Sequence, residues 1–188
     1  MSRMHEQQLR EAIVACGRKL SDQGLVQGTW GNISVRLDEG HMLVTPSGLD
    51  YYALQPEDIV VVNLADVSYS GIRKPTSERP FHREILVTRP EFNAVIHTHS
   101  QCCGVFAAAR QNIPVTQAEA KRLLGGDVRC APHALPGTKQ LTKQAVKALE
   151  GRSACLLAHH GVICCGRDLD GAFAVCQTIE QTAGVLLQ

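Results

Sequence analysis

The chain has 188 residues, of which 44% are hydrophobic and 20% are charged, and its formal net charge is +1. This length allows one domain with a buried core, which we expect over residues 1–188. The sequence contains no Lys/Arg cluster and no run of about 18 apolar residues, so a nucleic-acid surface and a membrane span are both unexpected.

The eight cysteines form no Cys-x-x-Cys motif, and two pairs of them are adjacent in the sequence. Neither a zinc ribbon nor a secreted disulfide framework has this pattern. The N-terminal segment is polar and leads directly into a helical pattern, unlike a signal peptide. We therefore expect reduced, buried thiols and a cytoplasmic location.

In chain order, hydrophobic periodicity and turn signals predict alternating helices and strands. Helices are expected over residues 4–23, from about 80 to 88, and over 101–110, 139–150 and 169–187. Strands are expected over residues 42–45, 58–64, 93–98, 113–115, 128–132 and 154–164, with a turn region at 121–126. Because the strands cluster in the middle of the chain, we expect an α/β fold with a mixed central sheet flanked by helices on both sides.

Two glycine-containing turns carry short polar residues, Thr29 and Asn32 in the first and Ser47 beside Gly48 in the second. Such turns can hold a phosphate group through backbone amides and hydroxyls. For each turn taken alone, an ordinary chain reversal is the commoner explanation.

Thr76 and Ser77 precede the expected second helix, where either is a good N-cap and Pro80 fits the first turn. The free amides of a helix N-terminus favour an anion. Glu78 lies in the same turn, and the default interpretation from the local sequence is a carboxylate that stabilises the helix end.

His97 and His99 end a short apolar run and are separated by one residue. In an extended strand, such side chains point to the same face, so together they form half of a metal site. A strand end with two solvated histidines is an equally good explanation. The apolar segment 154–164 is interrupted by His159 and His160, of which at most one can join the first pair because they face opposite sides.

Five motifs occur here in the order and spacing that they have in the class II aldolase/adducin family, which the chain resembles over nearly its whole length. They are Gly28-Thr29-x-Gly31-Asn32-x-Ser34, Thr45-Pro46-Ser47-Gly48, Thr76-Ser77-Glu78, His97-x-His99 and His159-His160-Gly161.

The resemblance implies that His97, His99 and His160 bind one Zn²⁺ per subunit, with His159 structural. It implies that Glu78 is the catalytic carboxylate and a further metal ligand in the empty site. The residues that match the family's phosphate pocket are Thr29, Asn32, Ser47, Gly48, Thr76 and Ser77.

The implied activity is a reversible cleavage of a ketose 1-phosphate, similar to L-fuculose 1-phosphate, into dihydroxyacetone phosphate and a short aldehyde. Zinc would stabilise the enediolate left when the C3–C4 bond breaks, and Glu78 would move the proton at C3.

Two departures from the family pattern leave the aldehyde side unassigned. Ala118 stands where aldolases of the family have a tyrosine, and its neighbours Gln117 and Glu119 are candidate substitutes. A C-terminal tail with a second tyrosine has no counterpart before Gln188. A sugar-phosphate 4-epimerase or a methylthioribulose-1-phosphate dehydratase on the same fold is the alternative. A non-catalytic adducin-like module is less favoured, because all metal residues are present.

The resemblance also implies a C4 homotetramer with a small sugar-phosphate substrate at subunit boundaries. Residues 104–109 and the stripe formed by Phe173, Ile179 and Leu186 are candidate contacts, although both fit ordinary core helices equally well. In such an assembly, Glu119 or a nearby residue would approach the zinc of the adjacent subunit.

Overall fold

The computed structural model describes residues 3–188. Its helices are α1 (Arg3–Asp22), α2 (Arg79–Thr88), α3 (Gln101–Ala109), α4 (Ala118–Leu124), α5 (Lys139–Ala148) and α6 (Leu169–Leu186), with a 3₁₀ turn at Pro56–Asp58. Its strands are β1 (Asn32–Arg36), β2 (His41–Val44), β3 (Val60–Asn63), β4 (Tyr69–Ser70), β5 (Ala94–Thr98), β6 (Arg129–Ala131), β7 (Ala154–Leu157) and β8 (Gly161–Gly166).

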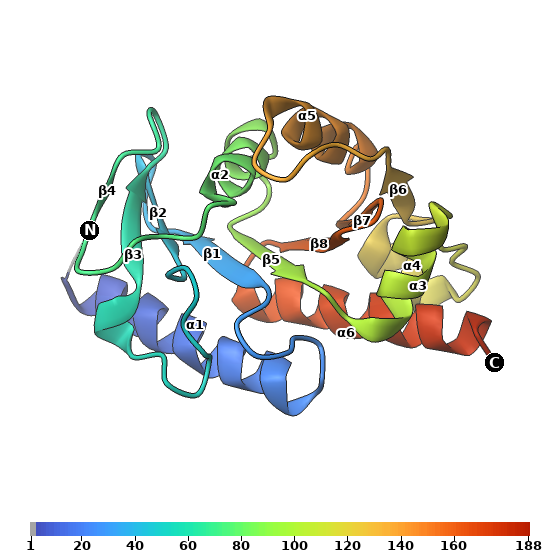
Figure 1. The fold of residues 1–188 in the computed structure, drawn as a ribbon, viewed down its shortest axis with the longest axis horizontal. Coiled ribbons are helices and arrows are strands. Elements are labelled where there is room, and N and C mark those ends of the chain that lie inside the picture. The colour runs from blue at the N-terminus through green and yellow to red at the C-terminus, as the bar shows by residue number, and fades with distance from the viewer. Residues whose placement is uncertain (1–2) are drawn as a thin grey trace.

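The eight strands form one sheet in the order β4-β3-β2-β1-β5-β8-β7-β6. Neighbouring strands are antiparallel except β6 and β7, which are parallel. In Figure 1, α1 and α6 lie on one side of the sheet, and α2 and α5 lie on the other. The predicted α/β fold, with a mixed sheet between helices, is therefore confirmed.

The central strand β5 supplies the core on both faces of the sheet because its side chains alternate. Ala94 and Ile96 belong to the hydrophobic cluster under α1, α3 and α6, whereas Val95 belongs to the cluster under α2 and α5. All five residues of β5 are buried. A strand packed on both faces reads as an apolar run, and this explains the run that precedes His97.

The segment 154–164 is not one strand, as we had expected, but two antiparallel strands joined by a short turn. Leu157 pairs with Gly161, and the two histidines lie between them. His159 adopts a left-handed backbone conformation with φ of 59°. This conformation reverses the chain and directs His160 towards the end of β5.

Three smaller expectations were wrong. Residues 121–126 are not a turn region, because α4 runs through Leu124 and ends at Gly125, whose left-handed backbone suits a helix end. Ile113 makes only an isolated bridge with Val128 instead of a strand. The third strand begins at Val60, after the 3₁₀ turn, and not at residue 58.

All eight cysteines are free thiols, and six of them are buried. Burial raises the pKa of Cys16, one of these buried thiols, to about 12. The predicted reduced thiols are thus confirmed as free and mostly buried. Among residues 3–188, no helix has the length and apolar character that a membrane crossing requires.

Candidate metal centre and phosphate pocket

The predicted metal ligands come from three separate elements that meet at one end of the central strands. His97 is the fourth residue of β5, His99 follows that strand, and His160 lies in the turn between β7 and β8. Glu78 is the residue immediately before α2. The pairing of β5 with β8 brings residues 97 and 160 together although they are far apart in the sequence.

One nitrogen of each of His97, His99 and His160 lies within 4.8 Å of the corresponding atom of the others. The Nε2 atoms of His97 and His99 are 2.9 Å apart. The carboxylate of Glu78 reaches the same point, with Oε1 3.2 Å from His160 Nε2 and Oε2 3.4 Å from His97 Nε2. His159, in contrast, is exposed and accepts a hydrogen bond from Arg110 Nε at 2.7 Å.

Glu78 does not stabilise the helix end, although this was the default interpretation of its position. It is the N-cap residue of α2, and its side chain makes no capping hydrogen bond. Burial raises the pKa of Glu78, but a hydrogen bond from His160, the His97 imidazole and a hydrogen bond from Asn32 together lower it below its usual value. The carboxylate is therefore ionised at neutral pH. The predicted N-caps were wrong: Thr76 Oγ1 instead accepts from the backbone amide of Glu78 at 3.2 Å.

The imidazoles of His97 and His99 are in the neutral form that binds metal ions. Burial lowers the pKa of His97 to about 3 and also lowers that of His99. The Nδ1 of His97 lies 2.9 Å from the carbonyl oxygen of Val162, which accepts its hydrogen and leaves the Nε2 lone pair free. Three imidazoles beside one carboxylate fit a divalent transition metal, and zinc binds such sets at about 2.0–2.2 Å. The side chains of the site therefore fit the metal that the motifs imply.

The six predicted phosphate residues all line one cavity of about 310 Å³. The same cavity is lined by Glu78, His99 and His160, so the predicted phosphate residues and the candidate metal ligands belong to one site. Its wall also includes the N-terminal end of α2, where free amides favour an anion. Thr76 is held there by its backbone amide, which donates to Thr45 O at 3.1 Å.

Two glycines allow the backbone to close around the metal centre. A Cβ at Gly161 would lie 2.5 Å from the carbonyl oxygen of Thr98 and 2.9 Å from His97 Cε1. A Cβ at Gly31 would lie 2.7 Å from the carbonyl oxygen of His97, and its φ is +103°. Both positions therefore require glycine.

Sequence reasoning assigned no role to four residues of this region, although Ser34 stands in the first of the five motifs. Pro136 and Gly137, from the loop before α5, line the cavity. Ser34 and His82 are fully buried behind it and hydrogen-bond towards Asn32. The signal for His82 was its spacing of four residues from Glu78, which places both on one side of a helical turn. Nothing in the local sequence marked the loop.

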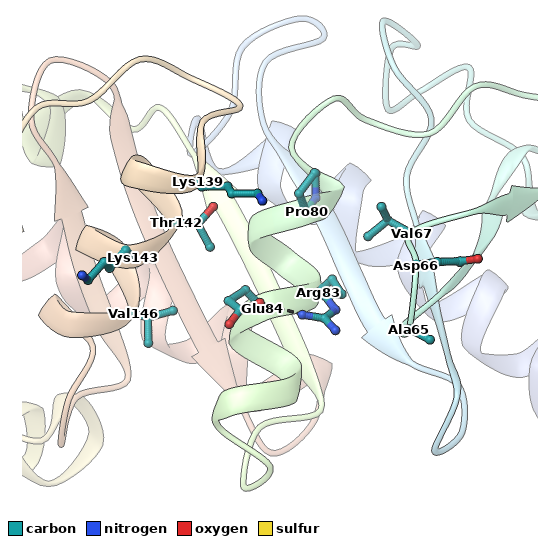
Figure 2. A pocket seen from close by; sticks show the side chains of 10 residues that line it. All are labelled: Ala65, Asp66, Val67, Pro80, Arg83, Glu84, Lys139, Thr142, Lys143 and Val146. Atoms are coloured by element: carbon teal, nitrogen blue, oxygen red, sulfur yellow. Dashed lines mark hydrogen bonds and ion pairs between the residues drawn. The ribbon is translucent and has the colours of Figure 1, made fainter.

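A second cavity, of about 650 Å³, lies between α2, α5 and the turn before β4, as Figure 2 shows. Its charged residues include Arg83 and Glu84, which pair with each other at 2.7 Å. None of the predicted site residues lines it, and it contains no histidine. It is therefore separate from the metal centre.

The candidates for the aldehyde side and for subunit contacts differ in exposure. Ala118 and Glu119 are exposed in the first turn of α4, and Glu119 lies 3.5 Å from Arg122 in an exposed pair. In α6, Ile179 is fully buried and Phe173 packs against the same core. Of the apolar stripe considered for subunit contacts, only Leu186 remains substantially exposed.

Comparison with known proteins shows similarity over almost the whole chain. The family model described as "Class II Aldolase and Adducin N-terminal domain" matches residues 11–187. A 5-methylthioribulose-1-phosphate/5-deoxyribulose-1-phosphate aldolase from Rhodospirillum rubrum is 41% identical over 93% of this chain and 78% of its own length. A 5-deoxy-D-ribulose 1-phosphate aldolase from Bacillus thuringiensis is 39% identical over 97% of this chain and 85% of its own.

Among solved structures, an L-fuculose 1-phosphate aldolase superimposes with a TM-score of 0.89. It is 35% identical, and the match covers 95% of this chain and 84% of the other.

Proposed function

Because the chain belongs to the class II aldolase and adducin family, we propose that it is a zinc-dependent aldolase that splits a ketose 1-phosphate into dihydroxyacetone phosphate and a short aldehyde. The family and the enzyme class predicted from the motifs are confirmed; the metal ion, the substrate and the residue roles are the proposal. The observation that carries it is that His99, His160, Glu78 and the predicted phosphate residues line a single cavity, with His97 clustered against the two other imidazoles.

His97, His99 and His160 would hold the zinc ion through their Nε2 atoms, and Glu78 would be a further ligand before substrate binds. When bound, the ion supplies Lewis-acid stabilisation of the negative charge that develops on substrate oxygens. Three imidazoles leave coordination positions open for those oxygens. The hydrogen bond from His97 to Val162 keeps the first imidazole oriented for this role.

Glu78 would carry the proton at C3 of the sugar. In the cleavage direction, the C4 hydroxyl would give its proton to water and the C3–C4 bond would break. Glu78, after taking a proton from water, would deliver it to C3, so that no net proton is released. In the reverse direction, the Glu78 carboxylate removes that proton. A low pKa keeps this group ionised and ready as the base, and its two oxygens lie beside His160 and His97.

The phosphate residues would hold the end of the substrate that does not react. Ser77 and Thr76 lie at the start of α2, and Ser47 and Gly48 form the facing turn. Binding energy gained there positions the reacting carbons beside the metal centre.

Ketose 1-phosphates with an apolar C5 end are our first choice of substrate. The two relatives described above are named for 5-methylthio and 5-deoxy sugars. Trp30, next to the pocket residue Thr29, is 62% exposed, and its ring centroid lies 5.9 Å from that of His99. An exposed indole beside a metal ligand offers an apolar surface to such an end.

The test is a substrate panel with zinc-loaded protein that includes 5-deoxyribulose, 5-methylthioribulose and L-fuculose 1-phosphates, with released dihydroxyacetone phosphate coupled to a reductase. We expect cleavage, fastest for the two apolar sugars. No cleavage of any member would contradict the proposal. The replacement of the family tyrosine by Ala118 keeps epimerisation or dehydration as the second candidate. NMR of the products separates these reactions, because only an aldolase splits the carbon chain.

We further propose that the protein is a cytoplasmic C4 homotetramer with one zinc ion per subunit. The eight free thiols suit a reducing compartment. The exposed first turn of α4, which carries Glu119, is available to a neighbouring subunit. The buried position of Ile179 removes it from the candidate contacts.

A further inference from the structure

Behind the metal centre, three buried polar side chains form a hydrogen-bonded chain that ends on Glu78. Ser34 Oγ lies 2.7 Å from His82 Nδ1, His82 Nε2 contacts Asn32 Oδ1, and Asn32 Nδ2 lies 2.8 Å from Glu78 Oε2. Ser34 and His82 are fully buried, and Asn32 is 6% exposed. Ser34 faces α2 from β1, whereas its neighbours Ile33 and Val35 face the opposite core.

Chemistry fixes the direction of every hydrogen bond in this chain. An ionised carboxylate only accepts, so Asn32 must present its amide nitrogen to Glu78 and its oxygen to His82. His82 Nε2 therefore carries the hydrogen. Because burial lowers the pKa of His82 to about 4, the ring is neutral, and its Nδ1 accepts from the Ser34 hydroxyl. All three donors point towards Glu78, and hydrogen bonds aligned in this way polarise one another.

We propose that Ser34 and His82 are positioning residues that fix the orientation of the Asn32 amide. In this orientation, Asn32 can donate one hydrogen bond to Glu78 and another to the substrate phosphate. One amide hydrogen of Asn32 holds Glu78 Oε2, and the second is left for a phosphate oxygen in the cavity that Asn32 lines. Asn32 thereby links the catalytic carboxylate to the phosphate pocket. The predicted effect on catalysis rests on the proposed function, whereas the predicted tautomer of His82 does not.

The sequence motifs alone place Asn32 only in the phosphate pocket and assign nothing to His82. The geometry changes that assignment because both ends of the amide already have protein partners. If His82 could no longer donate, Asn32 Oδ1 would be left buried and unpaired, and the amide would be free to rotate. Glu78 would then lose the hydrogen-bond donor that Asn32 supplies, and the phosphate would lose an oriented amide donor.

The first test is the tautomer of His82, read by nitrogen-15 NMR of the imidazole in zinc-loaded protein. We expect the Nε2–H form alone, and the Nδ1–H form would overturn the proposal. Ser34→Ala removes the donor to Nδ1 and should produce a mixture of tautomers. Cys165→Ala is the matched control, because Cys165 and Ser34 both pair with Val95, from its two sides.

The second test compares His82→Met, which fills the space without a donor, with His82→Gln, whose amide can still donate to Asn32. Affinity for inorganic phosphate is measured by calorimetry in metal-free and in zinc-loaded protein. His82→Met should weaken binding about 3- to 10-fold in both, since one oriented hydrogen bond is lost. His82→Gln should recover most of the affinity. Wild-type phosphate affinity in His82→Met would overturn the proposal.

The third readout separates this inference from the proposed function. With a cleavable substrate, His82→Met should lower kcat about 10- to 100-fold, and His82→Gln should restore much of it. If no substrate is cleaved, the aldolase proposal is contradicted. The tautomer and the phosphate affinities then still test the positioning role of Ser34 and His82. If His82→Met does not fold, Ser34→Ala with its Cys165→Ala control carries the same three measurements.

Discussion

The Nε2 atoms of His97 and His99 lie 2.9 Å apart. Because the hydrogen of His97 lies on Nδ1, its Nε2 accepts a hydrogen bond from His99 Nε2, and Glu78 and His160 lie beside the same point. This relationship explains why a buried, polar cluster is stable at the end of an apolar strand: a cation at that point would satisfy all four groups at once.

Metal content is the first prediction. Purified protein should carry about one zinc ion per chain, and His97→Ala, His99→Ala or His160→Ala should each remove most of it because a ligand is lost. The matched control is His159→Asn, since asparagine tolerates the left-handed backbone at that position. Plasma mass spectrometry measures the zinc. Loss of zinc from His159→Asn with retention in His160→Ala would reverse the assignment of the two histidines.

Glu78→Gln should remain folded and keep its zinc, because three imidazoles still bind the ion. Its cleavage rate should fall by about 10²–10⁴, since an amide cannot exchange the proton at C3. The coupled assay for dihydroxyacetone phosphate measures the rate, and zinc content is the control. Turnover close to that of the unmodified protein would exclude Glu78 from proton transfer.

Gly161→Ala should separate β8 from β5 at the metal centre, because the new Cβ would overlap the Thr98 carbonyl and the His97 ring. We expect reduced zinc content and a loss of about 1–3 kcal/mol in the free energy of unfolding, measured with urea. Gly104→Ala is the control, since nothing lies within 4 Å of its added Cβ in α3. Equal effects of the two substitutions would contradict the steric argument.

The pH dependence of stability follows from His82 and His97 in metal-free protein. Burial lowers their pKa values to about 4 and about 3, below the usual value of 6.5. The unfolded chain therefore binds more protons than the folded chain as pH falls below about 6.5. Stability should be full above that pH and decrease towards pH 4, by up to about 1.4 kcal/mol per pH unit for each histidine.

Urea unfolding at pH 7, 6 and 5 measures this decrease. His82→Gln removes one of the two titrating groups. The slope of the free energy of unfolding against pH should then decrease by an amount that corresponds to about one proton. An unchanged slope in His82→Gln would show that His82 is protonated equally in the folded and unfolded states.

Assembly is the last prediction. Light scattering should give a tetramer, and specific activity should fall on dilution if a neighbouring subunit completes the aldehyde side. Glu119→Gln should then reduce activity without changing zinc content, because Glu119 is exposed in its own subunit. A monomer that keeps full activity at nanomolar concentration would contradict both the tetramer and the shared site.

The sequence by itself determined the fold class and the chemical groups of the site. Apolar runs and helical periodicity predicted most elements, because the sheet is buried on both faces by amphipathic helices. Spacing alone indicated His97 and His99, and the resemblance to the class II aldolase/adducin family added His160 and Glu78. Boundaries that depend on backbone reversal, such as the turn at His159 or the start of α4, were not predictable in this way.

Only the tertiary structure decided what each polar group does. Glu78 could cap α2 or face the histidines, and its local sequence favoured the cap; the pairing of β5 with β8 supplies the imidazoles that make the second arrangement stable. His82 contacts Asn32 although it lies fifty residues away along the chain, and the proposed positioning of the Asn32 amide depends on this contact. Such roles depend on which side chains are brought within hydrogen-bond distance in a buried region, and packing of helices against the sheet decides that distance.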